Sequence, residues 1–364
     1  MIDIFITKVY DKPKERTGSL LRERTGGISV AATIRDITKM TGLSLATVSK
    51  YLNGGNVLPE NRALIEQAIR ELHYEVNEVA RGLAKNKTKT IGVLIHHLDN
   101  IFASTIIARI EDILRQHDYG TIVCDCRGDL KLEEQEIRFL LSKRVDGIIT
   151  LPTSGNAEYL KPAVERKVPV VLIDRTFGNG MFDTVLVDNR EAVRGAVSVL
   201  IEKGHQRIGM ICGGDQEYTA RERLRGYFEA LESANQKIED GLIKRGELSV
   251  QHGYRGMQEL LEMEERPTAV FLSNYEITLG AIVALNESGL KFPEDISIVG
   301  FDNMMLSQVI RPKLWMVVQP MDEIAEQAAE LMLKRLEFDI EGEPVSVHLK
   351  TELICGDSIR EITG

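Results

Sequence analysis

Polar and charged side chains that could bind a small molecule stand just after short apolar runs in this sequence. Asp174 follows the run 169–173, Asn274 follows 268–272, and Asp302 follows 296–299. Runs of this length, separated by segments long enough for a helix, predict parallel strands, and ligands bind beyond the carboxyl ends of such strands. An aromatic ring, carboxylates, an amide and an arginine together suit the hydroxyl groups of a sugar. The candidate ligand-binding residues are Phe102, Asp174, Arg175, Arg223, Asn274 and Asp302.

Catalytic motifs are missing from the sequence. It contains no G-x-S-x-G, no H-E-x-x-H and no P-loop, and the pair Gly213-Gly214 alone is not a dinucleotide fingerprint. The four cysteines form no CxxC pair and have no metal-ligand spacing, and three of them end apolar runs. We therefore predict neither an enzyme nor a cofactor or metal site, and we interpret Cys124, Cys126 and Cys212 as small buried strand residues.

A second segment with functional potential is 33–53, TIRDITKMTGLSLATVSKYLN, which predicts two short helices around a tight turn. Thr33 and Asp36 have capping-box spacing, Gly42 can end the first helix, and Ser44 can cap the second. The apolar spacing predicts that Ile34, Ile37 and Met40 in the first helix, and Leu43, Val48 and Leu52 in the second, face inward.

The outward face of the second predicted helix is small and almost uncharged. It consists of Leu45, Ala46, Thr47, Ser49 and Lys50. Such a face gains little from contact with water, but it fits the major groove of DNA. Apolar spacing alone does not show that the hairpin binds DNA, because a helical hairpin in any globular domain could have the same spacing.

The order of residues adds a resemblance to the LacI/GalR family of bacterial transcription regulators. In the hairpin, TIRDI (33–37), GLS (42–44), ATVS (46–49) and LNG (52–54) are similar to the DNA-binding headpiece of that family. Further along, RVDGII (144–149), PVVLIDR (169–175), GHQRI (204–208) and PEDISIVGFD (293–302) are similar to its effector domain. The resemblance implies an all-α helix-turn-helix headpiece followed by a two-lobed α/β domain of the periplasmic-binding-protein type I, with doubly wound parallel sheets.

The resemblance also implies which residues contact DNA. Residues 77–83 match the family's hinge, a short helix that orders on operator DNA, and Leu83 matches the leucine that paired hinges insert into the minor groove. Gly82 stands where the family usually has serine, and glycine lowers helix propensity by roughly 1 kcal/mol relative to alanine. The candidate DNA-binding residues are Thr33, Ser44, Leu45, Ala46, Thr47, Ser49, Lys50, Asn53, Asn77, Ala80 and Leu83.

We expect four segments along the chain. Residues 1–30 are interpreted as a disordered extension or as a mis-called start, since Val30 stands where proteins of the resembled family begin. The headpiece is expected over 31–76, the hinge and linker over 77–89, and the effector-binding and dimerisation domain over 90–364. Its N-lobe should comprise 90–189 and 320–345, and its C-lobe 190–318 and 346–364.

Charge and hydropathy agree with this division. Residues 1–88 hold 14 basic and 10 acidic residues, so their net charge is +4. The whole chain carries −10, so the remaining residues carry −14. A basic end on an acidic body fits a DNA-binding module joined to a domain that does not bind DNA. No apolar run approaches the roughly 18 residues that cross a bilayer, and no signal pattern is present, so we predict a cytoplasmic protein without membrane contact.

The resulting hypothesis is a repressor whose binding to operator double-stranded DNA is controlled by a small-molecule effector, with carbohydrate as the favoured class. Tyr275 departs from the family's usual Asn-Asp pair, which weakens any specific sugar assignment. A purine-like co-repressor or a partner protein remains the alternative. A transport binding protein would need a signal peptide and no headpiece. The C-terminus carries no heptad segment, so a homodimer is favoured over a tetramer.

Overall fold

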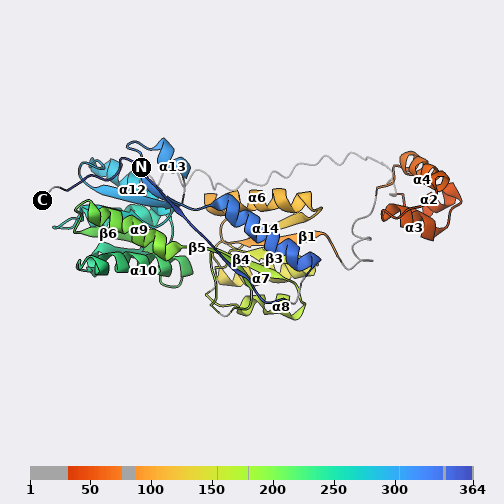
Figure 1. Ribbon diagram of the computed structural model, residues 1–364, viewed down its shortest axis with the longest axis horizontal. Coiled ribbons are helices and arrows are strands. Elements are labelled where there is room, and N and C mark those ends of the chain that lie inside the picture. Colours follow the sequence, from red (N-terminus) through yellow and green to blue (C-terminus); the bar gives the residue numbers. More distant parts are fainter. Residues whose placement is uncertain are drawn as a thin grey trace, which may run out of the picture. The chain divides into compact units, whose positions relative to one another are not determined.

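The computed structural model describes residues 32–75, 87–153, 155–178, 180–302, 304–338 and 342–362 (Figure 1). The chain divides into two compact units, with the boundary between Glu78 and Val79. The expected extension 1–30 and the expected hinge residues Asn77, Ala80 and Leu83 lie outside the described residues. None of the helices in the described ranges is long and apolar enough to cross a membrane.

The first unit is a three-helix headpiece. Its helices are α2 (Ile34–Thr41), α3 (Leu45–Leu52) and α4 (Pro59–Leu72). They enclose a small core whose fully buried members are Ile37, Val48, Ile65 and Ala68. The expectation that Met40 also faces inward is wrong, because its side chain is 47% exposed. A three-residue spacing falls short of the 3.6-residue helical turn, so residues 34, 37 and 40 rotate progressively away from one face.

The second unit contains two six-stranded sheets, one in each lobe. The order in the first sheet is β11-β5-β4-β3-β1-β2, and in the second β12-β10-β9-β8-β6-β7. The first sheet consists of β1 (Thr90–Ile95), β2 (Gly120–Asp125), β3 (Gly147–Thr150), β4 (Val170–Ile173), β5 (Asp183–Val187) and β11 (Ser346–Leu349). The second consists of β6 (Ile208–Gly213), β7 (Ile243–Gly246), β8 (Ala269–Leu272), β9 (Ser297–Asp302), β10 (Trp315–Val318) and β12 (Glu352–Ile354). All pairs are parallel except β10 with β12.

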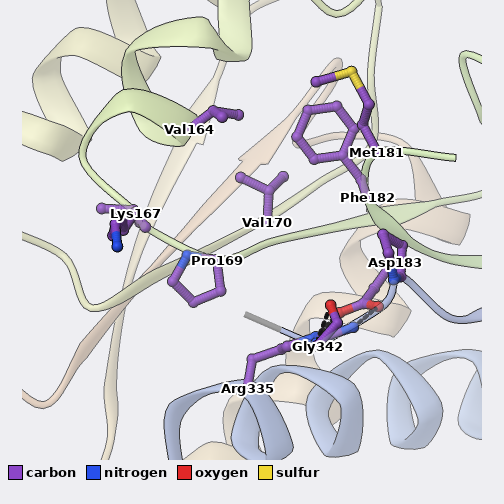
Figure 2. Close-up of a pocket in the computed structure, with 11 residues that line it drawn as sticks. Val164, Lys167, Pro169, Val170, Met181, Phe182, Asp183, Arg335 and Gly342 are labelled. Atoms are coloured by element: carbon purple, nitrogen blue, oxygen red, sulfur yellow. Dashed lines mark hydrogen bonds and ion pairs between the residues drawn. The ribbon is translucent and has the colours of Figure 1, made fainter. Parts of the chain in front are cut away.

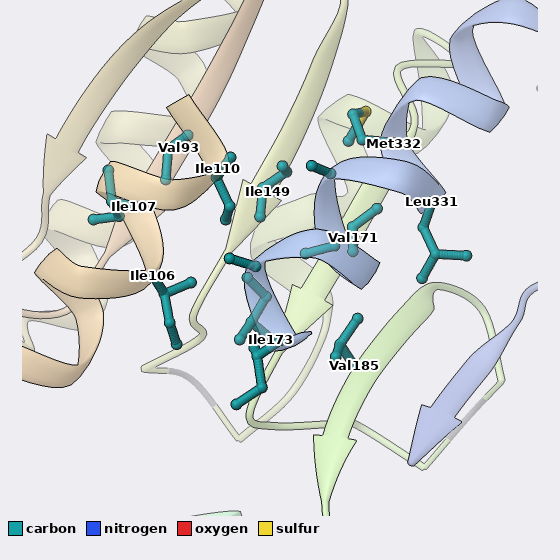
Figure 3. Close-up of a cluster of buried hydrophobic side chains, with 14 of the residues drawn as sticks. Val93, Ile106, Ile107, Ile110, Ile149, Val171, Ile173, Val185, Leu331 and Met332 are labelled. Atoms are coloured by element: carbon teal, nitrogen blue, oxygen red, sulfur yellow. The ribbon is translucent and has the colours of Figure 1, made fainter. Parts of the chain in front are cut away.

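Helices cover both faces of each sheet, which explains why the central strands are apolar throughout. In the first lobe α6 (Ile101–Gln116) and α14 (Met321–Glu337) pack on one face, as Figure 3 shows, and α7 (Leu130–Ser142) and α8 (Lys161–Glu165) on the other. In the second lobe α9 (Asn189–Glu202) and α10 (Tyr218–Ser233) cover one face, and α11 (Val250–Leu261) and α12 (Tyr275–Ser288) the other. The remaining short helices are η1 (Glu158–Leu160), η2 (Asp240–Leu242) and α13 (Met304–Val309).

The chain crosses between the lobes three times, after β5, after β10 and after β11. The expectation that all of 346–364 lies in the C-lobe is therefore wrong for 346–349. Strand β11 pairs with β5 at the edge of the first sheet, with Val347 opposite Val185, and only β12 returns to the second sheet. An edge strand alternates between exposed and half-buried residues, so its sequence resembles that of a loop.

A buried ion pair fixes the chain just before β11. Arg335 of α14 donates from Nε and Nη2 to the two carboxylate oxygens of Asp183 at 2.7 and 2.8 Å, and to the carbonyls of Gly342 and Glu343. The Val345 amide also donates to Asp183. The pair lies beside a cavity of about 290 Å³, shown in Figure 2. A bidentate guanidinium–carboxylate pair with this many additional hydrogen bonds is among the stronger kinds of ionic contact.

We expect Arg335→Ala to lower the free energy of unfolding of the second unit by about 3–5 kcal/mol, because the substitution leaves the Asp183 carboxylate buried without its partner. Urea denaturation followed by circular dichroism measures the change. The control is Arg115→Ala, since Arg115 pairs with Glu111 and Asp112 on the exposed face of α6, and such pairs contribute about 0–1 kcal/mol. Equal effects of the two substitutions would contradict the role assigned to the buried pair.

Candidate effector cleft and nucleic-acid interface

Polar residues gather where the two lobes meet, and Arg175 lies beside Glu217 and Asn100 beside Glu276 there. We call this region the cleft. Two of its carboxylates belong to residues with left-handed backbone, which residues other than glycine rarely adopt. Asp174 follows β4 in the first lobe, and Asp302 ends β9 in the second, with φ values of 64° and 94°. Left-handed backbone is unfavourable for residues other than glycine, and aspartate tolerates it better than most. Each strand therefore turns sharply at its carboxyl end, where ligands of parallel sheets bind.

Arg223 organises the second-lobe side of the cleft. Its side chain is 4% exposed, and it donates from Nε to Oδ1 of Asn189 at 2.7 Å and from Nη1 to the Ser273 carbonyl. Its guanidinium lies 3.8 Å from the centroid of the Phe301 ring, and Nη2 is 3.8 Å from Oδ1 of Asp302. A planar cation held on several sides cannot change its orientation freely. Arg223 is therefore a rigid part of the site.

Asp302 and Asn274 complete this side by binding the N-terminus of α12. Asp302 accepts from the Tyr275 amide at 3.0 Å through Oδ2 and from Gln319 Nε2 at 2.5 Å through Oδ1. Asn274 is the N-cap residue, and its Oδ1 accepts from the Ile277 amide at 2.9 Å. The structure thus brings together Arg223, Asn274 and Asp302, three of the residues expected from the sequence.

Asp174 and Arg175 reach the same region from the first lobe. Arg175 Nη2 lies 3.7 Å from Oε2 of Glu217, the N-cap residue of α10 in the second lobe. The pKa of Asp174 is raised to about 6, chiefly by burial; the guanidinium groups of Arg223 and Arg175 act to lower it, and the carboxylates of Asp302 and Glu217 act to raise it. The charges that act on Asp174 therefore include three groups of the second lobe, Arg223, Asp302 and Glu217.

A second contact between the lobes was not expected from the sequence. Asn100 caps α6 through Oδ1, which accepts from the Ala103 amide at 2.9 Å, and its Nδ2 donates to Oε1 of Glu276 at 2.7 Å. The other oxygen of Glu276 accepts from Asn274 Nδ2 at 2.6 Å. Burial, and after it the Asp302 carboxylate, raise the pKa of Glu276 to about 7. One carboxylate therefore connects the first turns of a helix from each lobe.

Sequence reasoning missed Gln319, Glu217 and Glu276. Gln319 directly follows the apolar run 314–318, so the rule that selected Asp302 could also have selected it. Glu217 and Glu276 lie at helix starts, and acidic residues are common there for reasons unrelated to ligands. Nothing in their spacing distinguishes them.

Phe102 differs from the other candidates. Its side chain is 7% exposed and belongs to the hydrophobic core beneath α6. The ring therefore has packing partners inside the first lobe, and stacking on an effector stays a prediction.

Several buried polar atoms around the cleft have no hydrogen-bond partner. The acceptors are Asp174 Oδ1, Glu217 Oε2 and Gln319 Oε1, and the donors are Asn189 Nδ2 and Arg175 Nε. Buried polar groups are almost always hydrogen-bonded, so a site with unpaired donors and acceptors from two lobes is suited to a polar ligand. Among the described residues no group of histidines, cysteines and acids could hold a metal ion.

The headpiece presents the outward face of α3 that the sequence predicts. Ser44 caps the helix by accepting from the Thr47 amide at 3.1 Å, and Val48 is fully buried beneath it. Leu45, Ala46 and Lys50 are exposed. The pairs 45/49 and 46/50 are each four residues apart, so these positions form one continuous surface.

The other predicted DNA contacts of the headpiece flank this surface, at or near helix ends. The Thr33 amide and hydroxyl both donate to the Asp36 carboxylate, at 2.9 and 2.7 Å. At the other end of α3, Asn53 Nδ2 donates to the Ser49 carbonyl at 2.8 Å. These side chains fix the ends of the helices that carry the exposed face, and their contacts with DNA remain predictions.

Comparisons with known proteins agree with both units. The family model described as bacterial regulatory proteins, lacI family, matches residues 33–77, and the periplasmic binding protein-like domain matches 197–359. Catabolite control protein A of Priestia megaterium is 36% identical over 304 residues, which cover 83% of this chain and 92% of that protein. The HTH-type transcriptional repressor PurR of Proteus mirabilis is 35% identical, with coverage of 84% and 90%.

Solved structures give the same result. The lac repressor dimer bound to operator and the anti-inducer ONPF superposes with a TM-score of 0.81 at 25% identity, covering 91% of this chain and all of that one. The complex of the transcriptional regulator CelR with cellobiose gives 0.70 at 27% identity, covering 90% and 99%. These similarities define a helix-turn-helix regulator with a two-lobed domain of the periplasmic-binding-protein type. The chain belongs to the LacI family of bacterial transcription regulators.

The raised pKa of Asp174 leads to a stability prediction. The charged carboxylate is disfavoured in the folded state, so the cost is fully present above pH 6 and is lost as the pH falls toward the ordinary aspartate value near 4. We expect Asp174→Asn to raise the free energy of unfolding by about 1–2 kcal/mol at pH 8, and by less as the pH approaches 4.

Urea denaturation at several pH values measures this effect. Asp99→Asn is the control, because Asp99 is exposed in the loop just before Asn100. A pH-independent gain, or an equal gain in the control, would contradict the assignment to buried charge.

Proposed function

We propose that this protein represses transcription by binding operator DNA through α3 and that a small carbohydrate in the cleft weakens this binding. Membership of the LacI family supports the role of transcription regulator, and the exposed face of α3 supports contact with base edges in the major groove of DNA. As predictions, Asn77, Ala80 and Leu83 contribute minor-groove contacts, and the protein acts in the cytoplasm.

The unpaired polar atoms of the cleft carry the carbohydrate assignment. Each sugar hydroxyl can both donate and accept, so a polyhydroxyl ligand can satisfy acceptors such as Asp174 and Gln319 together with donors such as Asn189 and Arg175. These groups come from both lobes, so binding would link them. The CelR structure supports the same class, since that regulator was solved with cellobiose.

A purine-like co-repressor is the second candidate, because PurR proteins are among the relatives. A flat base needs an aromatic or apolar face as well as polar edges. Phe102, the aromatic residue expected to provide such a face, packs in the core of the first lobe. We therefore rank the carbohydrate first.

We further propose that the protein acts as a homodimer. A groove of about 750 Å³ is lined by residues of α6, α12, α13, α14 and the chain crossings, and it includes Ile101, Met305 and Val309. Met305 and Val309 are 71% and 73% exposed. Exposed apolar side chains gathered around a groove are typical of protein interfaces, and a second copy of the chain fits the closed symmetry of most oligomers.

The effector is expected to weaken operator binding by about 5- to 150-fold, the usual range of allosteric coupling. The operator can be selected from random duplexes, and its affinity measured by fluorescence anisotropy with a panel of sugars and purine bases. Asp302→Asn should abolish the response but leave operator affinity intact, since the residue lies in the cleft. A ligand that tightens binding would show a co-repressor instead, and a response to purines alone would favour the second candidate.

Lys50→Ala should cost about 1–3 kcal/mol on the selected operator and much less on random DNA, because lysine can bind guanine O6 or N7 in the major groove. Competition with unselected duplexes measures both values. Lys237→Ala, at an exposed site of the second lobe, is the control and should change neither. Equal losses on both kinds of DNA would show that Lys50 contacts only phosphate.

A further inference from the structure

The N-termini of three helices, α6, α10 and α12, lie close to the cleft residues. At the N-termini of α10 and α12 there is a glutamate, and at the N-terminus of α6 there is an asparagine that is hydrogen-bonded to one of these glutamates. Glu217 is the N-cap residue of α10, and Glu276 lies in the first turn of α12. Glu276 also accepts from Asn100, the N-cap residue of α6. Helix N-termini attract anions, and they are the usual places where proteins bind phosphate groups.

The arginines of the cleft are engaged in the same way. Arg175 lies beside Glu217, and Arg223 beside Asp302. The same two guanidinium groups act to lower the pKa of Asp174. Each cation therefore already has a carboxylate of the protein within 4 Å, which reduces the positive charge that an anionic ligand would meet.

The carboxylates also repel each other. The Asp302 carboxylate raises the pKa of Glu276, and both Asp302 and Glu217 raise that of Asp174. An anionic ligand would add charge of the same sign to a half-buried site, where like charges interact more strongly than in water. A hydroxyl group adds no charge and can still donate to these oxygens.

We propose that Glu217 and Glu276 act as internal anions that make the cleft select uncharged polyhydroxyl ligands and reject their phosphate esters. Each residue stands at a helix N-terminus, Glu217 at the N-cap of α10 and Glu276 in the first turn of α12, and such ends attract phosphate groups when no carboxylate of the protein is near. This inference rests on the proposed carbohydrate effector and specifies its chemical class.

The experiment uses calorimetry of the full-length protein with matched ligands: D-glucose and glucose 6-phosphate, D-ribose and ribose 5-phosphate, and inorganic phosphate alone. The variants are Glu217→Gln, Glu276→Gln and the double substitution. Glu232→Gln is the control, since Glu232 is exposed near the C-terminal end of α10. Circular dichroism checks folding, and the single variants serve if the double variant is not folded.

We expect the wild type to bind a phosphate ester at least about tenfold more weakly than its parent sugar, and the double variant to lose most of this difference. Inorganic phosphate should bind the double variant about tenfold more tightly than it binds the wild type or Glu232→Gln. Unchanged phosphate affinity in the double variant would overturn the inference, as would a phosphate ester that binds the wild type as well as its parent sugar. If no sugar binds but the variant gains phosphate affinity, the carbohydrate proposal fails and the role of the internal anions stands.

Discussion

The second-lobe wall of the cleft depends on one buried cation, the guanidinium of Arg223. An arginine cannot lose its proton in a protein, so burial requires that neighbouring elements supply acceptors. Asn189 does so from α9, the Ser273 carbonyl from the end of β8, and Asp302 from the end of β9. The position of this charge therefore fixes the ends of two strands relative to two helices, and these ends form the second-lobe wall of the cleft.

The same cluster connects the cleft to the chain crossings between the lobes. Asp302 accepts from Gln319, which directly follows β10 and precedes Pro320 and α14. A ligand that binds the unpaired oxygen of Gln319 would contact the segment in which the chain passes from one lobe to the other. A ligand shifts the equilibrium between two arrangements of the lobes only if its contacts differ between them. Contacts with this crossing segment would meet that condition.

The fold was predictable from the sequence to the extent that apolar runs mark buried strands. The sequence has nine short apolar runs that predict strands, at 91–95, 121–124, 147–151, 169–173, 184–187, 207–212, 268–272, 296–299 and 314–318. Each of them corresponds to a strand of the two sheets. The edge strands β7 and β11 were not expected, because Lys244 and Arg245 in β7, and Ser346 and His348 in β11, break the apolar pattern. Strand order and the crossing after β11 depend on pairing between distant segments, and local periodicity contains no information about such pairing.

The site was predictable for a related reason and to a smaller extent. The rule that ligands bind at strand ends selects Asp174, Asn274 and Asp302, and the structure places all three at such ends. The same rule cannot select Glu276, whose importance depends on Asn100 lying opposite it across the two lobes. A residue whose partner is more than a hundred positions away in the sequence can be recognised only once the topology is known.

The balance of charge in the cleft is suited to reversible binding of a polar ligand. Fully paired carboxylates and arginines would stabilise the unliganded protein but would leave no group for a ligand, whereas isolated buried charges would destabilise the fold. The observed arrangement lies between these limits. Arg223 and Arg175 each have a carboxylate within 4 Å, while burial raises the pKa of Asp174 and of Glu276 and so makes their charged forms unfavourable. Hydroxyl groups that donate to these oxygens would stabilise the charged carboxylates. Binding of such a ligand would therefore offset part of the unfavourable free energy of burying these charges.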